Sequence, residues 1–334
     1  MKKKIIGLLK ILIPISLGLF LVYHIYNQLD TGQRMAMFES FKEANYFWIV
    51  VSLAMGLTSH YIRGYRWRFQ MEAMGYHTRT ANNFMAVMIG YIVNMVLPRV
   101  GEVSRAAAIT KYEKVPFQKS FGTILAERAI DLIVLMMIGI ATVILQYELL
   151  EEFADQIFAE ITKAASSPTL WIGLVVAVIL VFVLFFVFRK LRHNSFFSKI
   201  NALVDGLIEG LRSIFRMKRR VEYVLATVAI WVLYIGMFWV CFFSLEATSH
   251  LGANAIFAAF VLGSFAIVLI PGGIGAYPVG IMQCLLLYGI AQETGFALGW
   301  IIWLSQTIMI VLFGGLSMLY IPIYNKKHPT HVES

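Results

Sequence analysis

Two short segments place ionisable side chains inside an otherwise apolar chain. One runs "NMVLPRVGEVSRAA" from residue 94, and the other runs "LAERAIDL" from residue 125. An ionisable group near the centre of a bilayer costs about 2.5–3.5 kcal/mol on insertion scales, so it usually faces a cavity and has a partner. The two segments therefore predict one functional site of mixed charge. Its candidate residues are Asn94, Pro98, Arg99, Gly101, Glu102, Arg105, Glu127, Arg128 and Asp131.

The spacing within each segment predicts how the site is built. If a half-helix restarts after Pro98, Glu102 and Arg105 lie three residues apart on one face and can pair. Gly101 permits a close approach of the backbone, and Asn94 can hydrogen-bond the carbonyls that the proline leaves free. A simpler alternative stays open, in which this segment is a cytoplasmic loop whose charges are solvated.

Two further segments have less specific interpretations. The glycines of "GGIG", Gly272, Gly273 and Gly275, resemble a turn that cradles phosphate, although such breaks are also ordinary at the tips of re-entrant hairpins. The segment "RGYRWRF", residues 63–69, is predicted to anchor the chain at the membrane interface, although Arg63 and Arg66 could also contact a lipid headgroup.

The chain lacks the motifs of the common enzyme classes. No pairing of His with Ser or Cys suggests nucleophilic catalysis, and there is no HExxH, CxxC or Walker motif. Cys241 and Cys284 lie in apolar runs, which predicts neither a disulfide nor a metal site. We therefore expect no catalytic residues, no cofactor and no metal.

The composition predicts an all-α polytopic membrane protein. Hydrophobic residues make up 59% of the 334 positions and charged residues only 14%, far too few to cover a soluble domain of this length. Runs of about 20 apolar residues are long enough to cross a bilayer. The sequence predicts about six transmembrane helices, at 5–26, 46–68, 123–147, 169–188, 221–245 and 295–322.

Two shorter regions, about 84–110 and 254–291, have Pro and Gly at their middle and are predicted to be re-entrant broken-helix hairpins. If both return to the side they came from, 28 Lys and Arg residues can be assigned to the two sides. All fall on the cytoplasmic side except Arg34, Lys42, Lys163 and Arg128, as the positive-inside rule requires. Both termini are then cytoplasmic.

A spacing shared by the hairpins suggests an inverted-topology repeat. Gly90 and Pro98 recur as Gly263 and Pro271, offset by 173 positions, as expected where discontinuous helices of two halves meet near the midplane. Residues 1–325 are predicted to form one transmembrane domain, followed by a tail at 326–334. The basic amphipathic segment at about 196–220 is expected to lie on the anionic inner leaflet. The net charge of +9 follows from this topology and gives no reason to invoke nucleic acid.

The residues of the first two segments resemble a known family. They match the pattern N-x(3)-P-x(2)-G-E-x(2)-R followed by E-R-x(2)-D, which is typical of the transmembrane region of lysylphosphatidylglycerol synthases and the related flippase-like proteins. The late "PGGIG" at 271–275 is similar to the second signature of that family. Family members often carry a glutamate where this chain has Pro278, so Tyr277 is the nearest polar group there. Only a short tail follows residue 322, so we expect this chain to lack the soluble aminoacyltransferase domain of the full-length synthases.

The resemblance implies a multi-pass protein of the bacterial inner membrane that moves a polar-headed lipid or a lipid-linked precursor between leaflets. Its partners would be membrane lipids, with anionic headgroups bound by Arg99 and Arg105, and it would not be an enzyme. Three alternatives stay open: a membrane-embedded lipid-modifying enzyme, a secondary transporter of ions or small solutes, and a protein that recruits a separate transferase. The sequence also leaves open a homo-oligomer.

Overall fold

The computed structural model describes residues 16, 18–97, 100–146, 208–210, 212–213 and 216–328, and these residues form α-helices and short 3₁₀ helices with no strand among them. The prediction of an all-α membrane protein is confirmed. The predicted span at 169–188, most of the span at 5–26 and most of the basic segment at 196–220 lie outside the described residues.

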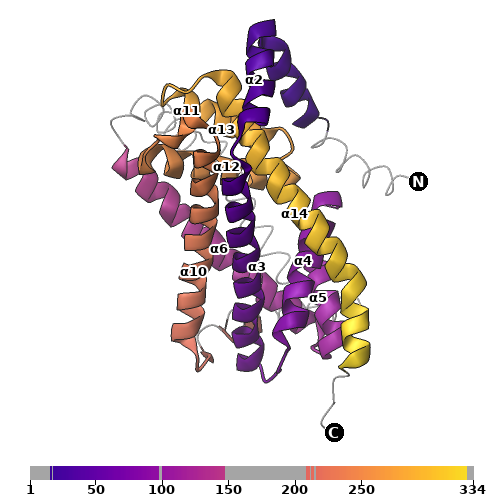
Figure 1. The fold of residues 1–334 in the computed structure, drawn as a ribbon. Helices are drawn as coiled ribbons and strands as arrows, with labels where there is room; N and C mark the ends of the chain where they lie inside the picture. The colour runs from indigo at the N-terminus through magenta and orange to yellow at the C-terminus, as the bar shows by residue number, and fades with distance from the viewer. Residues whose placement is uncertain are drawn as a thin grey trace, which may run out of the picture.

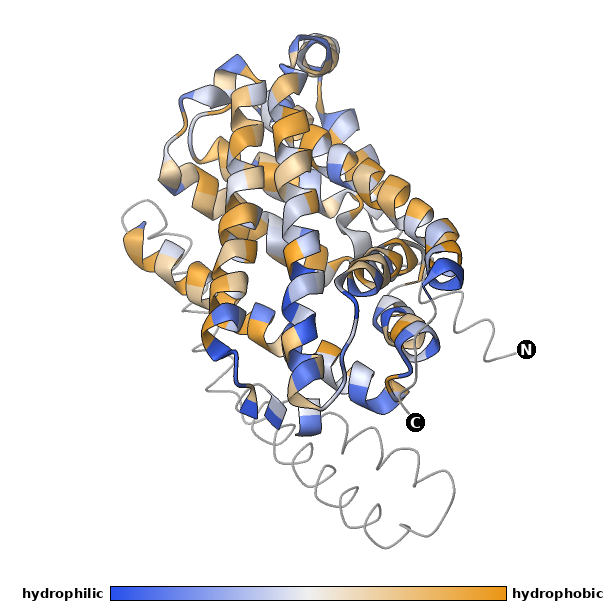
Figure 2. Cartoon of the chain, turned by 60° about the horizontal axis from the view of Figure 1, so that its bottom comes forward, coloured by the Kyte–Doolittle hydropathy of each residue, from blue (hydrophilic) through white to orange (hydrophobic). Residues whose placement is uncertain are grey.

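Four long helices coincide with four of the predicted spans: α3 (Tyr46–Ala73), α6 (Phe117–Leu145), α10 (Arg220–Cys241) and α14 (Gln292–Lys327). Among the described helices, α6, α10 and α14 are long and apolar enough to cross a membrane. The 28 residues of α3 also reach far enough, about 42 Å at 1.5 Å per residue, but its second half carries arginines. Hydrophobic residues dominate the length of the helices, and hydrophilic residues gather towards the bottom of the molecule (Figure 2).

The first broken region forms a tight pair of antiparallel helices, α4 (Thr80–Val96) and α5 (Val100–Glu113). A Cβ atom added to Gly101 would lie 2.0 Å from the carbonyl oxygen of Gly90. The two glycines therefore allow the helix backbones to touch, which larger side chains would prevent. Pro98 and Arg99, which lie between the helices, are outside the described residues.

The second broken region has the same construction. It consists of α12 (Ala253–Leu269), the 3₁₀ turn η2 (Pro271–Gly273) and α13 (Ala276–Leu286). Gly272, Gly273 and Gly275 have positive φ angles of 77°, 66° and 73°, a conformation that favours glycine. The turn is fixed to α14 because the indole Nε1 of Trp303 donates a hydrogen bond of 2.7 Å to the carbonyl oxygen of Gly272. Both predicted hairpins thus occur as paired helices.

The two halves of the chain are arranged as an inverted repeat would arrange them. Shifting the bounds of α4 by the 173 residues that separate Gly90 from Gly263 gives the bounds of α12. α3 packs along α10, and the backbone N–H of Asn45 before α3 donates to Ser244 O after α10, so the two helices are antiparallel. Figure 1 shows the first hairpin in the lower half of the molecule and the second in the upper half.

Matching contacts join the ends of the two halves. Asn325, near the end of α14, donates a 2.8 Å hydrogen bond to Asn82 at the start of α4. At the opposite end of the molecule, Gln146 after α6 donates a 2.9 Å bond to the carbonyl of Asn254 at the start of α12. Each hairpin is therefore attached by its first helix to the end of a long helix from the other half.

The remaining described elements connect this framework. Residues 18–28 are helical. Asp30 caps the N-terminus of α2 (Thr31–Glu43), because its side chain accepts a hydrogen bond from the backbone N–H of Gln33. After α10 the chain forms η1 (Phe242–Ser244) and α11 (Glu246–Ser249). These elements lie towards the top of the molecule in Figure 1, away from the first hairpin.

Candidate functional site: a buried charge cluster beside the first hairpin

The carboxylate of Glu127 on α6 is the centre of a buried ionic cluster. Arg105 of α5 donates to both of its oxygens, at 2.8 Å and 3.2 Å. Arg63 of α3 donates to Glu127 Oε1, and Arg66 Nη2 lies 3.5 Å from that oxygen. None of these four side chains is more than 3% exposed. Buried charges are tolerated only where they are paired in this way.

Asp131, one helical turn further along α6, joins the same cluster. Its Oδ2 accepts from Arg63 Nη1 at 2.6 Å, and its Oδ1 accepts from Arg66 Nη2 at 3.5 Å. The one-turn spacing of the two acids on α6 therefore presents both to the arginine face of α3. Over the five side chains, three arginines oppose two carboxylates, which leaves one surplus positive charge.

Neutral side chains hold the arginines in place. Tyr234 Oη of α10 accepts from Arg63 Nε and Nη2 at 3.3 Å and 3.1 Å, and Arg66 Nη1 donates to Thr227 of the same helix at 2.9 Å. The guanidinium of Arg105 lies 3.9 Å from the ring centroid of Trp67, close enough for a cation–π contact. The arginines of the cluster are therefore held by contacts from α3 and α10, the helices that relate the two halves.

A second ion pair lies at the edge of the cluster. Arg128 Nε on α6 is 3.6 Å from Glu102 Oε1 on α5, and these side chains are 38% and 19% exposed. Asn94 on α4 donates to Glu102 at 3.2 Å and accepts from the backbone N–H of Gly101 at 2.8 Å. Asn94 thereby ties the end of α4 to the start of α5.

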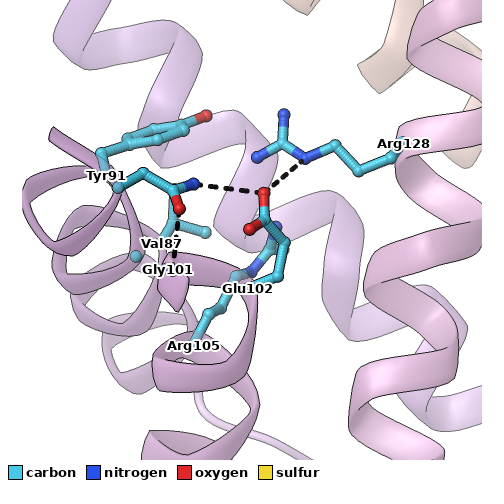
Figure 3. Close-up of a pocket in the computed structure, with 8 residues that line it drawn as sticks. Val87, Tyr91, Gly101, Glu102, Arg105 and Arg128 are labelled. Atoms are coloured by element: carbon cyan, nitrogen blue, oxygen red, sulfur yellow. Dashed lines mark hydrogen bonds and ion pairs between the residues drawn. The ribbon is translucent and has the colours of Figure 1, made fainter. Parts of the chain in front are cut away.

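These side chains surround a cavity of about 10 Å³. A volume of that size is about what one water molecule needs, so the hairpin is closed around its polar groups. The cavity is lined by Val87, Gly90, Tyr91, Asn94, Gly101, Glu102, Arg105 and Arg128, several of which are drawn in Figure 3.

The structure brings most of the predicted candidates together but changes their pairing. The candidates that meet are Asn94, Gly101, Glu102, Arg105, Glu127, Arg128 and Asp131. The predicted pair of Glu102 with Arg105 is wrong, because Arg105 turns towards Glu127 and Glu102 towards Arg128. The predicted role of Asn94 is also corrected, since it bonds the N–H of Gly101 rather than carbonyls freed by the proline.

The remaining candidates stay apart from the cluster. Gly272, Gly273, Gly275 and Tyr277 belong to the second hairpin and do not line the cavity. Tyr277 is buried and packs against Gly263, where it joins the two arms of that hairpin. The turn η2 does pack against α4, so the two hairpins are neighbours even though their polar groups are not shared.

The sequence interpretation does not place Arg63 and Arg66 in the cluster. The predicted interface anchor is wrong for both, because Arg63 is 2% exposed and Arg66 is fully buried. One feature of the sequence indicates that Arg63 and Arg66 belong to the cluster. Glu127 and Asp131 require cationic partners, and these two arginines lie three residues apart on one face of α3. Among the described residues, no group of three His, Cys, Asp or Glu side chains is placed to hold a metal ion.

Comparison with known proteins identifies the family of the chain. Residues 8–314 match the family described as the lysylphosphatidylglycerol synthase TM region. The chain belongs to this family. It is also similar to the UPF0104 membrane protein MJ1595 of Methanocaldococcus jannaschii, with 24% identity over 291 residues that cover 82% of this chain and 84% of the relative. No solved structure matches. The charged hairpin described above lies within the part that matches the lysylphosphatidylglycerol synthase TM region.

Proposed function

We propose that the protein moves a polar-headed lipid, or a lipid-linked precursor, between the leaflets of the inner membrane. The observation that carries the proposal is a buried, net-positive arginine cluster whose Arg105 lines a cavity together with the ion pair of Glu102 and Arg128. A second support is membership of a membrane family named after an enzyme of lipid synthesis. The protein would act as a flippase-like transporter rather than as an enzyme.

The chemistry of the cavity suits a phosphate-bearing headgroup. Arg105 and Arg128 both line it, and a guanidinium can bind phosphate oxygens through two parallel hydrogen bonds. Arg128 is the more exposed and more loosely held of the two. On the outer face of α6, exposed apolar residues such as Leu132, Ile133 and Met136 would leave the acyl chains in lipid while the headgroup is shielded.

A cavity of about 10 Å³ cannot hold a headgroup, so transport requires a second conformation in which the hairpin opens. Glu102 and Arg128 must separate, because they join α5 to α6 across the cavity, whereas the pair of Arg105 with Glu127 joins the same helices from within the buried cluster. A ligand that binds only the open form shifts the population towards it. The 3.6 Å contact between Arg128 Nε and Glu102 Oε1 is longer than the bonds around Glu127, which favours opening at this point.

The distribution of charge supports an orientation with the C-terminus in the cytoplasm. Lys326 and Lys327 end α14, and Arg219 and Arg220 begin α10 at the same end of the molecule. The opposite end carries α2, with Arg34 and Lys42. Since cytoplasmic loops carry the excess of Lys and Arg, the lower end in Figure 1 would face the cytoplasm.

The experiment is lipid translocation in vesicles reconstituted with the purified protein, measured with headgroup-labelled fluorescent phospholipids and a membrane-impermeant quencher. We expect Arg128→Gln to slow translocation at least about tenfold, equivalent to about 1.4 kcal/mol of lost interaction. Lys111→Gln is the matched control, because it removes the same charge from an exposed position on α5.

Four outcomes would count against the proposal. Translocation that is equal in Arg128→Gln and the wild type would make the cavity irrelevant to transport. A wild type that moves ions but no lipid would favour a secondary transporter. No translocation, together with a lipid-modifying enzyme that co-purifies, would favour a protein that recruits a transferase, whereas lipid modification by the pure chain would favour a membrane-embedded enzyme.

A further inference from the structure

The three carboxylates of the site differ in how well their charges are compensated. Glu127 contacts three guanidinium groups, and Asp131 contacts two. Of the described residues, only Arg128 brings a guanidinium within 4.0 Å of Glu102, at 3.6 Å. Removing a proton from a carboxyl group inside a membrane is costly unless cations compensate the charge. Glu102 is therefore the carboxylate whose negative charge is least compensated by nearby guanidinium groups.

The two oxygens of Glu102 also have different surroundings. Oε1 accepts from Asn94 and faces Arg128. Oε2 is buried and has no hydrogen-bond partner among the described residues, although the residue lines the cavity. An ionised oxygen without a partner is expensive to bury. The position of Glu102 in the first turn of α5 offsets part of this cost, because helix N-termini favour negative charge by about 0.3–1 kcal/mol.

We propose that Glu102 is a proton-binding site coupled to binding of the headgroup. When the phosphate of an anionic phospholipid binds Arg128, Glu102 binds a proton. This inference rests on the proposed function and names what would drive it. In the closed state the positive Arg128 and negative Glu102 cancel. When the phosphate binds Arg128, Glu102 loses its cation and faces a second negative charge. One proton from water, bound at Glu102, restores neutrality.

The other titratable and charged groups around Glu102, among the residues that the structure describes, have identified partners or positions. Arg105 lies on its own helix and is held by Glu127, and α6 supplies Arg128 together with Glu127 and Asp131, which stay paired with Arg63 and Arg66 of α3. Tyr91 of α4 lines the same cavity. His60 of α3 is buried and lies against Tyr91, with 4.8 Å between ring centroids, so the test includes a variant of His60.

The coupling has a direction. Because the proton and the anionic headgroup bind together, each strengthens the binding of the other. A proton gradient would then move the lipid in the same direction as the protons. Glu127 and Asp131 would stay paired with the buried arginines throughout.

The test measures binding of phosphatidylglycerol to the detergent-purified protein by native mass spectrometry, together with proton uptake in weakly buffered solution. For the wild type we expect binding to tighten as the pH falls from about 8 to about 6, by up to about tenfold per pH unit for one linked proton. Uptake of about one proton per bound lipid should accompany it. Wild-type binding that does not change with pH would overturn the coupling.

Glu102→Gln tests whether the proton binds at Glu102 itself. The amide copies the protonated carboxyl, so the variant should bind at about pH 8 as tightly as the wild type does at about pH 6, without proton uptake. His60→Gln and the exposed Glu39→Gln on α2 should keep the wild-type profile. A pH profile that Glu102→Gln retains, or that His60→Gln abolishes, would overturn the assignment.

Failure of the proposed function would look different. If the wild type binds no phosphatidylglycerol at either pH and translocates no labelled phospholipid, the transport proposal itself fails. If lipid is bound and moved equally well at both pH values, the transport proposal is supported and only the proposed proton site at Glu102 is refuted.

Discussion

The two hairpins share a backbone design but differ in chemistry. In each, a glycine of the first helix contacts the second helix, Gly90 against Gly101 and Gly263 against Tyr277. Around the first hairpin, four arginines and three carboxylates converge. The second hairpin is held instead by the glycine turn and by the indole of Trp303.

The offset of 173 residues shows how complete the difference is. The positions that correspond to the charged residues of the first half hold apolar residues or glycine in the second. Glu102 corresponds to Gly275, and Glu127 corresponds to Trp300. In full, the counterparts of Arg63, Arg66, Arg105, Arg128 and Asp131 are Gly236, Trp239, Pro278, Ile301 and Leu304.

This comparison separates what the fold needs from what the function needs. Both hairpins form, so the buried charges are not required to build a broken-helix hairpin. Buried ion pairs are weak evidence for stability, because desolvation offsets their attraction. A cluster that is present in one half and replaced by apolar residues in the other is therefore best explained by its chemistry, and the following changes test that.

The largest effect is expected from Glu127→Gln. The substitution leaves Arg105 without its carboxylate and raises the surplus charge of the buried cluster, which should destabilise the protein by about 3–5 kcal/mol. The measurement is the apparent melting temperature in detergent, followed by tryptophan fluorescence.

Glu209→Gln is the matched control for that change. It breaks the 2.9 Å ion pair with Lys119, in which the lysine and glutamate side chains are 32% and 42% exposed, and exposed pairs contribute at most about 1 kcal/mol. Equal melting temperatures for Glu127→Gln and the wild type would show that the first half, like the second, does not need a buried carboxylate at this position for its stability.

An intermediate effect is expected from Gly101→Ala. Its Cβ would lie 2.0 Å from the Gly90 carbonyl and 2.5 Å from Asn94 Cγ, so the first hairpin must open, at a cost of about 1–3 kcal/mol. Gly280→Ala in the second hairpin meets nothing closer than 3.7 Å, and should be neutral or slightly stabilising, since alanine is a better helix former. Melting temperatures of the two variants give the contrast, and a tolerated Gly101→Ala would refute the close packing.

The sequence predicts the helices of the described fold better than it predicts the site. Pro98 and Pro271 mark the breaks because proline disrupts a helix locally, and the apolar runs mark the spans because bilayer thickness sets their length. Such signals lie within one segment of chain. They place α4 and α5, or α12 and α13, to within a few residues.

The pairing of charges depends on long-range packing instead. Glu102 and Arg105 satisfy the local three-residue rule, which stabilises a helix by only about 0.2–0.5 kcal/mol. That preference is overridden once α6 brings Glu127 against Arg105 at 2.8 Å. Arg63 could not be assigned from α3 alone either, because its partners lie more than sixty positions later.

The smallest effect is expected from Trp303→Phe, which removes the hydrogen bond to Gly272 O. Loss of one neutral hydrogen bond costs about 0.5–1.5 kcal/mol, so the melting temperature should fall slightly. Trp300→Phe is the control, because Trp300 lies on the same helix with its ring centroid 5.4 Å from that of Trp303. Among the described residues, no contact to the turn depends on the indole N–H of Trp300.

Since the second hairpin is structural in this comparison, Trp303→Phe should still translocate lipid at the wild-type rate. A loss of transport as large as that expected for Arg128→Gln would show that the uncharged hairpin also acts on the lipid, and the division between the two halves would fail.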